Sequence, residues 1–250
     1  MNKYTIKKTF EKKFPFNIWK IEVDSLKNLL AIECRNPDNT LPIFYVLSFN
    51  GEILLNEFVC ESREWTIESI QDDYLILKRF GEYSPIQSGI QVIHIPSSKI
   101  IYTYMEYVLK DVFDQTILAY HRSVPNGLPF YIQITSGEVK NSNQSTLKYR
   151  QRDINSPVVY SRKIPKFMEN VDYYEQLWIQ PYANNFLWAY HSKTNNQYQL
   201  NLALTSKNEV IDTKVVLNNL DKLIPQPFFT VKDYIFFLSS NKMKISSYLV

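Results

Sequence analysis

Glycine, cysteine and histidine are scarce in this sequence, and each shortage excludes a class of function. The 250 residues include only 5 Gly, 2 Cys and 3 His. Neither G-x-G-x-x-G nor G-x-x-x-x-G-K-[ST] occurs, so a glycine-rich loop that cradles a phosphate is excluded. Two cysteines cannot form a disulfide framework, and Cys34 and Cys60 lack the C-x-x-C spacing. We therefore expect no cofactor and no metal, and a missing G-x-S-x-G removes the usual serine-hydrolase signature.

Long apolar runs are also missing. The first 13 residues hold no apolar stretch of the kind found in secretory signals. The most apolar stretches, such as Tyr234 to Leu238, are far shorter than the roughly 18 residues that span a membrane. A cytoplasmic location without a membrane partner is the prediction.

No charge of one sign dominates. The 28 basic and 25 acidic residues leave a net charge of +3, which is small for a protein that neutralises many phosphates. One basic cluster runs from Lys148 to Arg152 and continues at Arg162 to Lys166, with Tyr149 and Tyr160 interleaved. That pattern suits single-strand binding by stacking, but a solvated strand face explains it more simply. Nucleic acid is therefore not the expected partner.

Apolar residues make up 45% of the chain and aromatic residues 15%, which is typical of a folded protein of one large or two small domains. Helical periodicity is nearly absent, and short alternating runs separated by Asn, Asp, Ser, Gly and Pro predict strands and turns. These runs repeat in the same order with the same turn residues. The clearest pair of copies is Leu30 to Arg35, Leu41 to Val46 and Asn50-Gly51 with Leu118 to Arg122, Leu128 to Ile132 and Ser136-Gly137.

A four-stranded unit that recurs about every 45 residues is the period of a β-propeller blade. We predict an all-β fold, a small propeller of five four-stranded blades over residues 1–250 as a single domain. Six blades, one of them degenerate, is the alternative. The last unit has only three strands of its own, so residues 4–8 are expected to pair with Ile245 to Leu249 and close the ring. An irregular insertion at about 141–170, with a possible hairpin around Val158 to Tyr160, breaks the rhythm.

The chain resembles the β-propeller superfold in the size and order of these units, although it carries neither the WD40 nor the kelch signature. Its layout and its composition rich in Tyr, Asn and Lys resemble a bacterial family of unknown function from the Bacteroidetes. The resemblance implies the fold alone, because propellers host enzymes, ligand binders and scaffolds alike.

Two carboxylates are candidates for catalysis. Glu22 and Glu68 occupy matching positions in the first strands of two units, where propeller hydrolases place an acid and a base on either side of a sugar bond. The same side chains could instead hydrogen-bond between blades. His121 and His191 also match in position, with Cys34 in the same register, but structural repetition explains this better than a metal site.

The aromatic residues divide by phase. Trp19, Trp65 and Trp178 recur at equivalent positions in the first strands of three units, and we expect them to pack between blades. Trp188 is out of that phase, and we name it with Tyr149 and Tyr160 as candidate binding residues. The predicted function is a non-catalytic binding or scaffolding propeller that uses the channel mouth and the insertion to bind a protein or a small molecule. The alternative is a glycan-active or other small-molecule hydrolase that uses Glu22 and Glu68.

Overall fold

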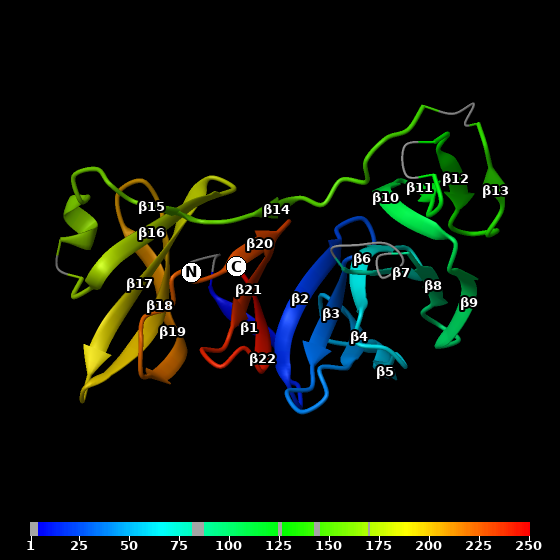
Figure 1. The fold of residues 1–250 in the computed structure, drawn as a ribbon. Coiled ribbons are helices and arrows are strands. Elements are labelled where there is room, and N and C mark those ends of the chain that lie inside the picture. Colours follow the sequence, from blue (N-terminus) through cyan, green and yellow to red (C-terminus); the bar gives the residue numbers. More distant parts are fainter. Residues whose placement is uncertain (1–4, 82–87, 125–126, 143–145, 170) are drawn as a thin grey trace. The chain divides into compact units, whose positions relative to one another are not determined.

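The computed structural model describes residues 5–81, 88–124, 127–142, 146–169 and 171–250. Its strands form five antiparallel sheets of four or five strands each (Figure 1). Within the described ranges, the single helical element is the 3-10 turn η1 (Lys166–Met168). The predicted all-β class is confirmed, and the repeated sheets fit a β-propeller-like fold. No helix among these residues is long and apolar enough to cross a membrane.

The chain separates into two compact units, which are described one at a time. Unit 1 comprises residues 1–13 and 153–250, and unit 2 comprises Phe14–Arg152. The prediction of one propeller domain over the whole chain stays a prediction.

Unit 2 contains three four-stranded sheets whose strand order follows the chain, as the repeat predicts. The first sheet consists of β2 (Asn17–Asp24), β3 (Leu29–Arg35), β4 (Pro42–Ser48) and β5 (Ile53–Val59). The second consists of β6 (Trp65–Gln71), β7 (Tyr74–Arg79), β8 (Ile90–His94) and β9 (Lys99–Tyr104). The third consists of β10 (Tyr107–Phe113), β11 (Thr116–His121), β12 (Phe130–Gln133) and β13 (Val139–Lys140).

Unit 1 contains two sheets of five strands, so the prediction of four strands in every sheet is wrong for these two. One has the order β1 (Lys7–Lys13), β22 (Lys244–Leu249), β21 (Tyr234–Leu238), β20 (Phe229–Val231), β14 (Ile154–Asn155). The other has the order β15 (Val158–Val159), β16 (Tyr174–Tyr182), β17 (Asn185–Thr194), β18 (Gln197–Thr205), β19 (Val210–Leu220). The extra strands, β14 and β15, both come from the insertion.

The insertion does not form the expected hairpin. β14 pairs with β20 and β15 pairs with β16, so the two short strands join different sheets instead of each other (Figure 1). The physical reason is that the edges of β20 and β16 present unpaired backbone groups, which a passing segment can satisfy. Residues 143–145 and 170 of the insertion lie outside the described residues.

The N-terminal strand pairs with the last strand of the chain, as predicted. In Figure 1 the blue strand β1 lies beside the red strand β22. The register runs from Lys7 opposite Leu249 to Lys13 opposite Lys244, so the strand lies further along the sequence than the predicted residues 4–8. Tyr4 is outside the described residues. The pairing covers the edge of β22 that would otherwise be exposed.

The cores lie between neighbouring sheets, where both faces of a strand are buried. In unit 2, apolar side chains of β3 and β4 pack against those of β6 and β7, and a second cluster joins β7 and β8 to β10 and β11. In unit 1, Leu187 and Leu202 belong to the same cluster as Ile235 and Phe237, which lie on the other sheet. Aromatic side chains such as Trp65 and Phe237 are part of these cores.

One of the three in-phase tryptophans does not pack as expected. Trp65 and Trp178 are buried, but Trp19 is 70% exposed. The pairing of β2 with β3 shifts register between Ile18 and Lys20, so Trp19 is the extra residue of a β-bulge. A bulged residue has no ladder partner and its side chain leaves the regular alternation. The expectation that Trp19 packs between sheets is therefore wrong.

Candidate functional site

The two predicted carboxylates, Glu22 on β2 and Glu68 on β6, are brought together by a lysine. Lys20 Nζ lies 3.2 Å from Glu22 Oε1 and 3.9 Å from Glu68 Oε2. Arg152 Nη1 lies 2.8 Å from the second oxygen of Glu22, Oε2, and Lys78 Nζ lies 2.8 Å from Glu68 Oε2. Lys20 also donates to the carbonyl of the residue before Glu68. The group therefore links two neighbouring sheets of unit 2.

Burial and charge act in opposite directions on Glu22. Burial raises the pKa of its carboxyl, whereas the nearby cations Arg152 and Lys20 lower it, and the pKa is raised overall. A raised pKa is what a general acid requires. Ion pairs that only link two sheets also perturb carboxyl pKa values, and Glu22 contacts two cations. The geometry is compatible with both readings of Glu22.

A second ionic cluster in unit 2 is centred on Arg150, a residue of the basic cluster that begins at Lys148. Its guanidinium donates five hydrogen bonds of 2.8 to 3.2 Å to Asp24, Asp72 and Asp114. These aspartates lie at the end of β2, after β6 and after β10, so one residue of each sheet contacts the same side chain. The hydrogen bond from Arg150 lowers the pKa of Asp72. Planar guanidinium groups suit such multidentate pairing.

Arg150 belongs to a short segment of the insertion, residues 148–152, that lies across the three sheets of unit 2. The Lys148 carbonyl accepts from the backbone N–H of Asp114, and the Gln151 carbonyl accepts from the Ser25 hydroxyl. This part of the insertion is therefore used inside the unit. The repeated Asp positions could have signalled it from the sequence, but nothing in the sequence pairs them with a residue so distant.

Tyr149, one of the predicted binding residues, lies on this segment and is 67% exposed. Its hydroxyl donates a 2.5 Å hydrogen bond to Asp111, and its ring lies 4.7 Å from that of Phe113. The hydrogen bond to Asp111 raises the pKa of the Tyr149 phenol. The ring is thus anchored at one edge and open to solvent elsewhere.

The other two predicted binding residues, Tyr160 and Trp188, meet in unit 1. Their rings are 4.8 Å apart at an angle of 66°. Trp188 is only 2% exposed, and its indole N–H donates to the Thr205 hydroxyl. Both residues line a pocket of about 260 Å³, which we call the insertion pocket. The insertion supplies one wall and β16, β17 and the turn after β18 supply the other, through Tyr160, Arg162, Pro165, Phe167, Ile179, Phe186, Trp188, Ser206 and Lys207.

The matching His121 and His191 have separate environments. His191 is fully buried on β17, and its Nε2 accepts a hydrogen bond of 3.1 Å from the backbone N–H of Ile224. Burial lowers its pKa to about 4. His121 lies in unit 2, where its ring meets that of Tyr107. Among the described residues, no group of three or more His, Cys, Asp or Glu is placed to hold a metal ion.

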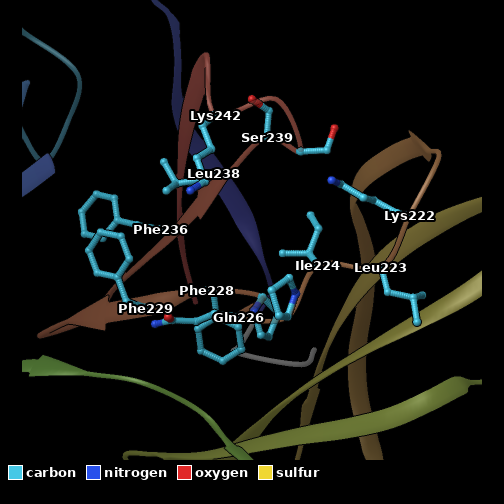
Figure 2. Close-up of a pocket in the computed structure, with 13 residues that line it drawn as sticks. Lys222, Leu223, Ile224, Gln226, Phe228, Phe229, Phe236, Leu238, Ser239 and Lys242 are labelled. Carbon is cyan, nitrogen blue, oxygen red and sulfur yellow. The ribbon is translucent and has the colours of Figure 1, made fainter. Parts of the chain in front are cut away.

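A larger pocket in unit 1 was not predicted from the sequence. It measures about 460 Å³ and lies between the segment that follows β19 and the strands β20 and β21. Figure 2 shows the rings of Phe229 and Phe236 side by side on one wall and Lys222 on the opposite side. The two rings are stacked with centroids 5.1 Å apart. We call this the phenylalanine pocket, and Lys242 also lines it.

A neighbouring pocket of about 340 Å³ has three lysines in its lining, and we call it the lysine pocket. Lys8, Lys214 and Lys244 line it together with Glu11 and Tyr248. Glu11 pairs with Lys8 at 2.7 Å and with Lys244 at 3.1 Å. Lys8 and Lys214 each lie 5.8 Å from the centre of the Tyr248 ring. The sequence does not predict that these lysines lie together, because they come from three strands that are distant in the sequence.

Comparison with known proteins adds little to this description. No protein-family model matches the sequence, and no curated protein does. Among solved structures, the chain is similar to that of Raptor from Chaetomium thermophilum, with 11% identity and a TM-score of 0.39. The match covers 97% of this chain and 29% of that chain, and at this level it carries no argument. The resemblance to a Bacteroidetes family stays a prediction.

Proposed function

We propose that this protein is a non-catalytic binding module whose insertion forms the binding site, and that its five sheets are the blades of a closed propeller. The observation that carries the proposal is the insertion pocket. Residues of the insertion fold back over β16 and β17 and wall a pocket that contains Tyr160 and Trp188. Irregular segments on a repeated scaffold are where binding surfaces are usually built.

The lining of the insertion pocket suggests the kind of partner. Aromatic rings provide the walls, and Arg162 and Lys207 add positive charge. The adjacent strand β15 is the edge of its sheet, and its residues Val158 and Val159 are exposed. An edge strand beside an aromatic pocket suits an extended peptide, which adds as a strand and inserts one side chain. The proposed partner is a peptide segment that carries an aromatic residue close to an acidic one.

Peptide display on the purified protein tests the proposal. Enriched peptides would be measured by fluorescence polarisation against the wild-type protein, Phe167→Ala and the control Leu128→Ala. Phe167 lines the pocket, whereas Leu128 is an exposed apolar residue of unit 2. We expect about tenfold weaker binding for Phe167→Ala, equal to about 1.4 kcal/mol, and no change for Leu128→Ala. Peptides that bind all three proteins equally would refute the proposal.

A glycan-active or other small-molecule hydrolase remains the second candidate, because burial raises the pKa of Glu22 as a general acid requires. Hydrolysis of a panel of aryl glycosides tests it. A rate that falls at least a hundredfold in both Glu22→Gln and Glu68→Gln would establish this function. If the pair only links two sheets, no substrate will be cleaved and both variants will lose stability.

A further inference from the structure

The phenylalanine pocket and the lysine pocket of unit 1 are continuous in their lining. Both are lined by Ser239 and Ser240, which follow β21. Ser239 and Ser240 therefore form a lip between a largely apolar space and one whose lining includes three lysines. Each volume, about 460 Å³ and about 340 Å³, lies within the range of small-molecule sites, roughly 300 to 1,000 Å³.

The apolar half is built to accept a hydrocarbon chain. Its walls are the stacked Phe229 and Phe236, with Leu238, Ile224 and two prolines. The lysines at its border, Lys222 and Lys242, can lay their methylene stems along the apolar surface while their ammonium groups stay in water. In Figure 2 these two side chains border the space that the phenylalanine rings line.

The cationic half carries more positive charge than the protein itself neutralises. Lys8 and Lys244 share the single carboxylate of Glu11. Within the described part of the chain, Lys214 makes no ion pair, and neither do Lys222 and Lys242 at the border of the apolar half. Lys214 donates to the backbone carbonyl of Ile6 at 3.3 Å, which leaves two of its three donors for other acceptors. An anion placed at the lip would gain charge-assisted hydrogen bonds.

We propose that the two pockets together bind a single-chain anionic amphiphile. Its hydrocarbon tail lies against Phe229 and Phe236, and its phosphate or carboxylate headgroup lies at the Ser239–Ser240 lip, facing Lys214 and Lys244. The ligand is a free molecule rather than a bilayer lipid, because the tail lies inside a pocket. This site is separate from the insertion pocket, so it goes beyond the proposed function.

Isothermal titration with a set of short ligands tests both halves of the site. Octyl phosphate and octanoate are expected to bind. Butyl phosphate is expected to bind more weakly by about fourfold for each methylene removed, and inorganic phosphate not at all. Octanol, which has the tail without the charge, is expected to bind at least tenfold more weakly than octyl phosphate. Equal binding of octyl and inorganic phosphate, or of octyl phosphate and octanol, would overturn the proposal.

The double variant Lys214→Gln, Lys244→Gln tests the headgroup position. We expect about tenfold weaker binding of octyl phosphate and unchanged binding of octanol, which also shows that the pocket is intact. Lys99→Gln, Lys110→Gln in unit 2 is the control with the same change in net charge, and it should bind both ligands like the wild type. In the wild-type protein, 0.5 M NaCl should weaken octyl phosphate but not octanol. Salt-independent binding of octyl phosphate would contradict the charge argument.

Two further measurements separate this proposal from others. Vesicles of phosphatidylglycerol that capture the protein, when octyl phosphate does not bind, would replace the free amphiphile with a membrane surface. The Phe167→Ala variant should bind octyl phosphate like the wild type, because it alters only the insertion pocket. Loss of octyl phosphate binding in that variant would overturn the proposal of a separate site.

Discussion

Replacing Arg150 with methionine removes a cation that contacts all three sheets of unit 2. The Arg150 side chain is only 9% exposed, and its partners differ in burial, from Asp24 at 0% to Asp72 at 28% and Asp114 at 50%. Only Asp24 is left fully buried without its cation, and breaking such a pair costs about 3 to 5 kcal/mol. Three backbone N–H groups still donate to Asp24. We therefore expect a loss of about 3 kcal/mol, at the lower end of that range.

Urea unfolding followed by tryptophan fluorescence measures this loss, because Trp65 is buried in the same unit. With an m-value of about 2 kcal/mol/M, the midpoint should fall by about 1.5 M. The control is Arg63→Gln. Arg63 is 72% exposed with its nearest carboxylate oxygen, on Glu64, 3.8 Å away, so its loss should cost less than about 0.5 kcal/mol.

The same cluster predicts how the difference depends on pH. The hydrogen bond from Arg150 lowers the pKa of Asp72 in the folded protein. The part of the stabilisation that comes from Asp72 is therefore complete above the unfolded pKa of about 3.9 and is lost as the pH falls through the lower folded value. The difference between the wild type and Arg150→Met should shrink below about pH 4. A difference under about 1 kcal/mol at pH 7, or one unchanged at pH 2.5, would refute the reasoning.

Two other predictions concern buried titratable groups. Burial lowers the pKa of His191 to about 4, so between pH 6.5 and 4 only the unfolded chain takes up the proton, and the free energy of unfolding should fall by about 3 kcal/mol. Urea titrations at several pH values would measure this fall, which should be missing in His191→Gln. An equal fall in the variant would contradict the prediction. Burial raises the pKa of Cys34 and of Cys60 to about 12, so neither thiol should react with Ellman's reagent at pH 8 until urea is added. Stoichiometric labelling of the folded protein would show that the two thiols are not buried.

Much of the fold could be predicted because its signals are local. Alternating apolar residues and turn residues within about ten positions of each other predict strands and hairpins. The repeat then groups the strands into sheets, and the missing strand of the last unit indicates the pairing of β1 with β22. The three four-stranded sheets of unit 2 follow the predicted units.

The candidate sites were harder to predict because their members are distant in the sequence. Glu22 and Glu68 could be named from their matching positions, but the lysine between them could not. Tyr160 and Trp188 were named separately, and the contact between their rings depends on how the insertion folds back. The lysine pocket draws its charges from three strands, and no spacing rule links them.

The sequence by itself determined that this protein is all-β, that it is built from repeated antiparallel units, and that its N-terminal strand pairs with the last one. The tertiary structure alone decided that Trp19 is exposed at a bulge, that the insertion splits between two sheets, and that Arg150 joins three aspartates. Strand and turn preferences are properties of neighbouring residues. Bulges, edge pairing and ion pairs depend instead on which distant groups packing leaves unpaired.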